Sequence, residues 1–200
     1  MCASAHAWKR SCKLTIAVED AQLSADGEWL FVLYVEDRGP RWLDVFDLAG
    51  GTRVGHFHPW VGQEMWWVDD KIAVSYGCGA PCAGFNVFTR EGVAVFNEVA
   101  AEVVFAPDRR SVVVSNPDRL TWTRRDGLPK LGVSLIELST LKRYPLSAEV
   151  PVEAESGETI PEVTWTRAEI QIAFKYGLTG DTGEEGHPLP REALFRFPRP

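Results

Sequence analysis

Glu102-Val-Val-Phe-Ala-Pro-Asp108 is one of four copies of a short pattern that decides the fold of this 200-residue chain. Each copy begins with an acidic residue, continues through mostly apolar, Ser or Thr residues, and turns tightly into a second strand-like run. The other copies are Asp20-Ala-Gln-Leu-Ser-Ala-Asp26, Glu64-Met-Trp-Trp-Val-Asp-Asp70 and Glu162-Val-Thr-Trp-Thr-Arg-Ala168. Such repetition predicts a protein built from similar β-sheet units.

The remaining sequence divides into strands that fit four such units. Alternating apolar and polar residues, bounded by Gly, Pro, Asn and Asp, predict about fifteen short strands and no helix. They group into three sets of four and one set of three, so we expect an all-β, small four-bladed β-propeller in a single domain, residues 1–200. Because the fourth blade lacks a strand, we expect the N-terminal strand Cys12–Val18 to pair with Ala193–Phe197 and close the ring. Ser147–Pro161, with four glutamates, is expected to be an acidic loop.

Two turns carry a resemblance to a known family. Ser24-Ala-Asp-Gly27 and Ala106-Pro-Asp-Arg109 are similar to the Ser-Pro-Asp-Gly turn of WD40-like and TolB-type propeller repeats, and the resemblance covers essentially the whole chain. The second and fourth copies depart from it, with Val68-Asp-Asp-Lys71 and Thr166-Arg-Ala-Glu169. The resemblance implies a propeller fold. Proteins of this kind include binding scaffolds and enzymes, so the fold does not decide the function.

The composition is that of a folded, acidic protein. The chain is 45% hydrophobic and carries a formal net charge of −7, so a basic protein would be steered toward it, whereas nucleic acid is not an expected partner. No apolar run approaches the roughly 20 residues of a membrane helix, so no membrane association is expected. Residues 1–7 end in an Ala-x-Ala pattern but lack the other parts of a secretory signal. As written, the sequence predicts a cytoplasmic protein; an extracytoplasmic one is the alternative if the true start lies upstream.

The four cysteines are Cys2, Cys12, Cys78 and Cys82. The last two enclose a short Gly- and Pro-containing turn between two predicted strands, where a disulfide, half of a metal site or two free thiols would each fit. A structural zinc site is disfavoured because neither a second cysteine pair nor a nearby histidine completes four ligands. The disulfide and the free thiols remain open alternatives.

Long connections are expected to gather on one face of the propeller and tight turns on the other. Binding residues often lie on long loops that a rigid scaffold positions, so the long-loop face is the predicted functional face. Trp and Arg contribute most to protein interfaces. The candidate anchors for a protein partner are therefore Trp60, Trp122, Arg124 and Arg125.

A second candidate site consists of the acidic residues that open the four innermost strands, Asp20, Glu64, Glu102 and Glu162. In a propeller they would recur around the central channel. Converging carboxylates repel each other unless a divalent cation such as calcium, or water and basic residues, lies between them. A solvated rim explains the same pattern.

Two functions follow from these sites. The first is a non-enzymatic binding scaffold that engages a protein partner, possibly basic in character, through its long-loop face. The alternative is a metal-dependent hydrolase or lyase in which the channel carboxylates hold a divalent cation as Lewis acid. The sequence contains no nucleophile elbow, P-loop, HExxH or dinucleotide fingerprint, so it gives no positive evidence for catalysis.

Overall fold

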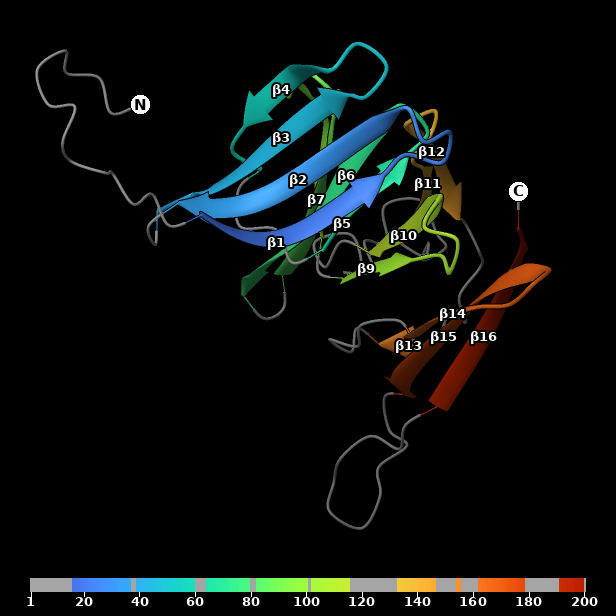
Figure 1. The fold of residues 1–200 in the computed structure, drawn as a ribbon. Coiled ribbons are helices and arrows are strands. Elements are labelled where there is room, and N and C mark those ends of the chain that lie inside the picture. Colours follow the sequence, from blue (N-terminus) through green and yellow to red (C-terminus); the bar gives the residue numbers. More distant parts are fainter. Residues whose placement is uncertain are drawn as a thin grey trace, which may run out of the picture.

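The computed structural model describes residues 16–36, 39–59, 64–79, 82–100, 102–115, 133–146, 154–155, 162–178 and 191–199. Within these ranges the protein is all-β and forms four separate antiparallel sheets, which confirms the predicted all-β class. The sheets follow the chain from the blue N-terminal strands to the red C-terminal strands (Figure 1). Within the described part of the chain, no helix has the length and apolar character to cross a membrane.

The first three sheets are four-stranded meanders, in which strands that are consecutive in sequence are neighbours in space. The first contains β1 (Ile16–Leu23), β2 (Trp29–Glu36), β3 (Arg41–Asp47) and β4 (Thr52–Phe57). The second contains β5 (Glu64–Val68), β6 (Lys71–Gly79), β7 (Cys82–Phe88) and β8 (Ala94–Ala100). The third contains β9 (Glu102–Phe105), β10 (Ser111–Ser115), β11 (Val133–Glu137) and β12 (Lys142–Leu146). The strands predicted to form the first three sets of four are therefore observed as three separate sheets.

The fourth sheet contains β14 (Glu162–Trp165), β15 (Glu169–Leu178) and β16 (Arg191–Pro198), and its remaining strand is the short β13 (Ala154–Glu155). β13 pairs with Leu178 and Gly177, beyond the part of β15 that pairs with β14. The prediction of a loop is wrong at these two residues. β15 is longer than β14, and β13 satisfies backbone groups at its far end. A two-residue strand has no alternating pattern that a sequence could reveal.

The predicted closure by the N-terminal strand is wrong for Ile16–Val18. These residues belong to β1 and pair with Glu36, Val35 and Tyr34 of β2, whereas β16 pairs with β15. Ile16–Val18 and the separately predicted strand 21–24 belong largely to one strand, β1, whose bulge between Val18 and Asp20 shifts the alternation of side chains and made it read as two. Residues 12–15 lie outside the described part of the chain.

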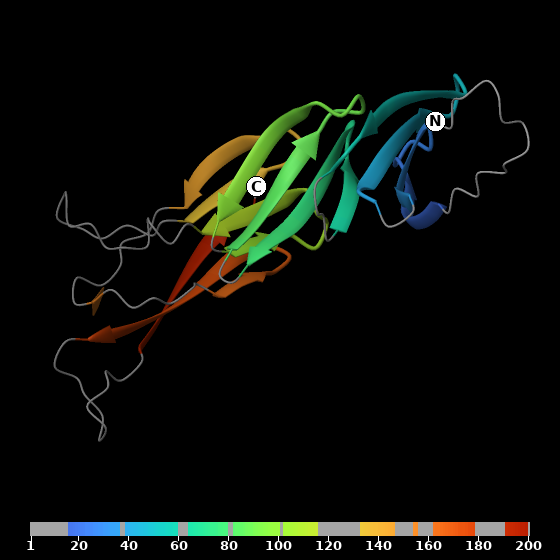
Figure 2. The same cartoon turned by 90° about the vertical axis from the view of Figure 1, so that its left-hand side faces the viewer.

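Successive sheets pack face to face around three apolar clusters. One cluster joins the first and second sheets through residues such as Phe31, Leu43 and Ile72. A second cluster joins the second and third sheets, and a third joins the third and fourth. Among the described residues no such cluster joins the fourth sheet to the first, and Figures 1 and 2 place these two sheets at opposite ends of the row.

The two family-like turns have the geometry that their residues predict. The Asp26 carboxylate accepts a hydrogen bond from the Glu28 backbone N–H at 3.0 Å, and Asp108 accepts one from Arg110 at 3.1 Å. The Ser24 hydroxyl also donates to Asp26, and this hydrogen bond is the main cause of the lowered pKa of that carboxyl. The last residues of the two motifs, Gly27 and Arg109, have φ of 74° and 57°, so both turns end in the left-handed region.

Candidate functional site

A cavity of about 600 Å³ opens at the inner edges of the first three sheets. Its walls come from β1, β2, β3 and β5 and from the turn between β9 and β10. The lining residues are Glu19, Asp20, Gln22, Leu33, Arg41, Glu64, Met65 and Arg109. Two members of the predicted carboxylate ring, Asp20 and Glu64, therefore share one cavity.

The bulge in β1 and the side chain of Gln22 position the carboxylates of the cavity. The bulge lies between Val18 and Asp20, and such a feature redirects the side chains beside it. Gln22 Nε2 donates to Asp20 Oδ2 and to the Met65 carbonyl, each at 2.9 Å. Trp67 Nε1 donates to the Gln22 carbonyl at 3.0 Å, which ties β1 to β5. The first and second sheets thus hold Asp20 in place together.

The cavity carries an excess of negative charge. Arg41 pairs with Glu19 at 2.7 Å, and Arg109 pairs with Glu64 at 3.0 Å. Asp20 accepts hydrogen bonds from Gln22 and from the Ala21 backbone, and no ion pair of the described residues gives it a basic partner. The cavity therefore presents three carboxylates to two guanidinium groups, and among the described residues Asp20 is the one of the three without a basic partner within ion-pair distance.

Arg109 is held in place by the aromatic residue beneath it. Its guanidinium lies 5.0 Å from the ring centroid of Trp66, and Trp66 Nε1 donates to the Arg109 carbonyl at 3.1 Å. Residue 109 occupies the position that glycine takes in the other family-like turn. The difference between the two turns thus places a cation beside the cavity.

The other two predicted carboxylates lie elsewhere. Glu102 is half-buried and its Oε2 is buried without a hydrogen-bond partner. Burial, and to a lesser extent the charge of Glu162, raise the pKa of Glu102. Within the described ranges, no group of three or more His, Cys, Asp or Glu residues has the spacing to hold a metal ion. The structure thus distributes the four carboxylates as two pairs, Asp20 with Glu64 and Glu102 with Glu162.

The predicted partner anchors Trp60, Trp122, Arg124 and Arg125 lie outside the described residues. The connections that carry them, and most of the predicted long-loop face, are likewise outside. The opposite face is formed by the tight turns, and the β1–β2, β7–β8, β9–β10 and β14–β15 turns are each closed by a backbone hydrogen bond.

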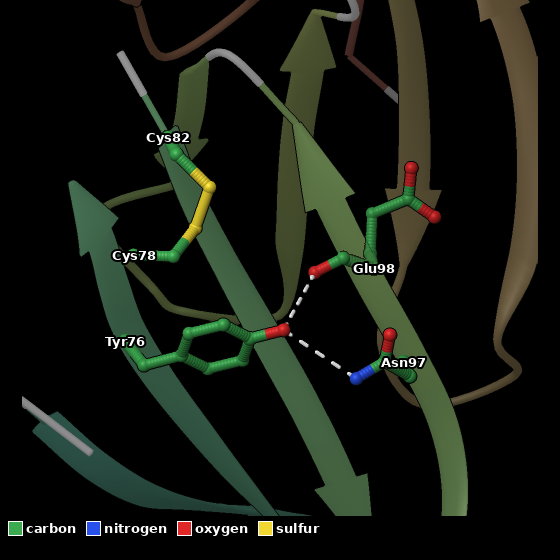
Figure 3. Close-up of a disulfide and its surroundings, with 5 residues drawn as sticks. All are labelled: Tyr76, Cys78, Cys82, Asn97 and Glu98. Atoms are coloured by element: carbon green, nitrogen blue, oxygen red, sulfur yellow. Dashed lines mark hydrogen bonds between the residues drawn. A yellow bond between two sulfur atoms is a disulfide. The ribbon is translucent and has the colours of Figure 1, made fainter. Parts of the chain in front are cut away.

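Cys78 and Cys82 form a disulfide between the end of β6 and the start of β7, with their Cα atoms 5.1 Å apart. Figure 3 shows Tyr76 beside it, with its hydroxyl donating to the Glu98 carbonyl at 3.5 Å and accepting from Asn97 Nδ2 at 3.4 Å. Gly84 leaves room for this ring, since a Cβ there would lie 2.5 Å from Tyr76 Cζ. Cys2 and Cys12 lie outside the described residues.

A polar cluster around Asp44 in the first sheet is absent from the sequence-based predictions. The buried Asp44 carboxylate lies 2.6 Å from His56 Nδ1 and accepts from Arg53 at 3.2 Å and from the Tyr34 hydroxyl at 3.5 Å. Burial and the nearby Asp44 charge raise the pKa of Tyr34. Trp42 stacks on His56 with centroids 4.5 Å apart. The available signal was an aspartate inside an otherwise apolar strand, Trp42-Leu-Asp-Val-Phe46.

Comparisons with family models and with curated proteins find no match to this chain. Among solved structures, the chain is similar to a prolyl endopeptidase, with a TM-score of 0.40 and 15% identity over 89% of this chain and 27% of the other. It is also similar to the dihydro-haem d1 dehydrogenase NirN, with a TM-score of 0.33 and 14% identity over 80% of this chain and 33% of the other. A third similar structure is an oligogalacturonate lyase in complex with manganese, with a TM-score of 0.33 and 12% identity over 82% of this chain and 44% of the other.

All three structures contain a β-propeller. The chain spans less than half the length of each of them. The likeness concerns the all-β architecture, and no activity is carried over from it.

Proposed function

We propose that this protein is a non-enzymatic binding scaffold of the propeller type, and that it engages a basic protein partner. The observation that carries the proposal is that the Asp20 carboxylate, in a cavity built by three sheets, has no described basic partner within ion-pair distance. The row of four antiparallel sheets, packed face to face, supports the interpretation of each sheet as one blade.

A lysine or arginine side chain of the partner fits the chemistry of the cavity. Such a side chain has an aliphatic stem and a charged end. Leu33 and Met65 supply apolar wall for the stem, and Asp20 supplies the counter-charge. Gln22 holds that carboxylate in place in the free protein, so a partner does not have to order it on binding.

The long-loop face is the second part of the proposed interface. Arg41 and Glu64 line the cavity: Arg41 ends the predicted long connection 36–41, and Glu64 directly follows the predicted connection 59–63. The proposed aromatic anchor Trp60 belongs to the connection that leads into Glu64. We propose that Trp60, Trp122, Arg124 and Arg125 enlarge the contact around the charged centre.

Substitution of Asp20 by asparagine is expected to weaken the binding of a short oligo-arginine peptide about 10- to 100-fold, because a charged contact contributes about 1.5–3 kcal/mol. Glu28→Gln is the matched control: Glu28 is exposed in the β1–β2 turn, outside the cavity, and its change alters the net charge equally. Isothermal titration calorimetry of both variants measures the difference. Equal weakening would show that the peptide responds only to net charge, and the cavity would lose its role.

The alternative function, a metal-dependent hydrolase or lyase, is favoured by a different observation. Glu102 Oε2 is buried without a hydrogen-bond partner, and Glu162 lies close enough for its charge to act on it. A divalent cation between the two carboxylates would satisfy that oxygen and remove their repulsion. A divalent cation held by these channel carboxylates would act as the Lewis acid of a hydrolase or lyase reaction.

If the alternative holds, calcium, magnesium or manganese should raise the melting temperature. A ligand that binds only the folded state at a hundredfold excess over its Kd stabilises it by about 2.7 kcal/mol. The variants Glu102→Gln and Glu162→Gln should lose this response, while Glu91→Gln, in the β7–β8 turn, should keep it. Differential scanning calorimetry measures these shifts, and an unchanged melting temperature with all three ions would remove the support for the alternative.

A further inference from the structure

The Cys78–Cys82 disulfide lies apart from the core of the protein. Cys78 is exposed and Cys82 is half-buried. Neither residue belongs to the three apolar clusters that join the sheets. Cysteine is otherwise among the residue types that are most often fully buried. This disulfide is therefore open to a reagent in solution without unfolding of the sheets.

Cys78 also lies outside the backbone ladder of its hairpin. In the pairing of β6 with β7, Gly77 pairs with Ala83. The next pair is Gly79 with Cys82, so the register shifts at Cys78 and leaves this residue without a partner. Gly79 has φ of 107°, a conformation that residues with side chains rarely adopt. Cys78 is the extra residue of a β-bulge, and it can change position without breaking a pair of the ladder.

Tyr76 holds this end of the hairpin without help from the disulfide. Its hydroxyl donates to the Glu98 carbonyl and accepts from Asn97 Nδ2, as Figure 3 shows. Its ring lies against Gly84, where a Cβ would come within 2.5 Å of Tyr76 Cζ. These contacts join β6, β7 and β8, and none of them involves a sulfur atom. Breaking the disulfide would leave them in place.

The disulfide encloses very little of the chain, since its two cysteines are separated by four positions. The stabilisation that a cross-link gives by restricting the unfolded chain is smallest for such short loops. The two strands are also held together by their own ladder, which extends to the pair of Gly79 and Cys82. The bond and the fold are linked reciprocally, so a bond that stabilises the fold little is protected little by folding.

We propose that Cys78 and Cys82 form a thiol-exchange site, at which a low-molecular-weight thiol such as glutathione reversibly opens the disulfide in the folded protein. The glutathione thiolate attacks Sγ of Cys78, the more exposed of the two residues. The S–S bond breaks, and its electron pair goes to Cys82 Sγ, which takes up a proton. The product is a mixed disulfide between glutathione and Cys78.

A second glutathione thiolate completes the exchange. It attacks the glutathione sulfur of the mixed disulfide, so Cys78 leaves with the electron pair and takes up a proton. Two glutathione thiols are thereby oxidised to one disulfide, and the protein disulfide is reduced to two thiols. The site is independent of the binding proposed at Asp20, because neither cysteine lines that cavity.

Redox titration of the whole chain in mixtures of reduced and oxidised glutathione tests the proposal. Cys2 and Cys12 are replaced by serine, so that one cysteine pair is titrated. Alkylation followed by mass spectrometry counts the free thiols, in buffer and in urea that unfolds the chain. The two equilibrium constants for reduction should differ by no more than about 30-fold, the factor that the chain-entropy relation gives for a loop this short. A larger difference would make the disulfide a structural cross-link and overturn the proposal.

The order of attack is tested by the reverse reaction with oxidised glutathione. In the same background, Cys82→Ser retains Cys78, and this variant should form the glutathione adduct several times faster than Cys78→Ser, which retains the half-buried Cys82. Equal rates, or a faster adduct at Cys82, would overturn the assignment of Cys78 as the attacked residue.

A variant with serine at both positions tests whether the fold depends on the bond. It should fold with wild-type tryptophan fluorescence and melt no more than about 8 °C lower, because the Tyr76 contacts remain. A chain that fails to fold, or that loses more than this, would show a structural disulfide and contradict the proposal. The glutathione titration does not depend on this variant, since it uses the intact cysteine pair.

Discussion

Replacement of Phe85 by alanine is expected to lower the free energy of unfolding by about 3–5 kcal/mol, the usual cost of removing a buried aromatic ring. Phe85 is 0% exposed and belongs to the cluster that joins the second and third sheets. Its ring centroid lies 5.6 Å from that of Phe96 and 5.7 Å from that of Phe105. The cavity left by the ring would weaken both the second sheet and its contact with the third. Urea denaturation followed by tryptophan fluorescence measures the change.

Val95→Ala provides the control for this experiment. Val95 is 42% exposed on β8, the outer strand of the same sheet, so its truncation should change the free energy by no more than about 0.5 kcal/mol. Comparable losses in the two variants would mean that the cluster around Phe85 is not the main apolar contact between these sheets.

Replacement of Gly55 by alanine is the second large expected effect, a loss of about 1–3 kcal/mol from overpacking. A Cβ at residue 55 would lie 2.1 Å from the Arg90 carbonyl oxygen and 3.3 Å from Val45 Cβ. The oxygen is a backbone atom of the β7–β8 turn, so the first and second sheets would have to move apart. The Arg90 guanidinium, 3.9 Å from the Trp29 ring centroid, would move with them.

Thermal unfolding followed by circular dichroism measures this loss, with Val54→Ala as the neighbouring control. Val54 is 37% exposed and its truncation creates no clash, so that variant should melt close to the wild type. If Gly55→Ala has the same melting temperature as Val54→Ala, the close approach of the two sheets at Arg90 is not a constraint on the fold.

The sequence predicted the strands well because their signals are local. Alternation of apolar and polar residues identified the four sheets, and the Asp-containing turns have the predicted hydrogen bonds at Asp26 and Asp108. The positions of strand ends were predicted less accurately: the strand predicted as Gly92–Asn97 is observed as Ala94–Ala100. Backbone ladders extend as far as a partner strand allows, which the strand's own residues do not specify.

The candidate site was predicted only in part. Asp20 and Glu64 were singled out as inner-edge carboxylates, and the structure places both in the cavity. The neighbouring Arg41 and Arg109 were not predicted to lie there. Arg41 comes from β3 and Arg109 from the β9–β10 turn of the third sheet, both far from Asp20 in the sequence. The Asp44 cluster was missed for the same reason, since its contact with His56 depends on the register of β3 and β4.

The sequence by itself determined the all-β class, the repeated strand units and their turns, because these depend on residues close together in the chain. Only the tertiary structure decided which strand faces another sheet covers. An apolar strand face has the same sequence pattern whether another sheet covers it, as at Phe31, or it is exposed to water, as at Val18. Covering is a property of the neighbouring sheet, so the pairing of Ile16–Val18 with β2 and the exposure of Ile16 and Val18 required the three-dimensional arrangement.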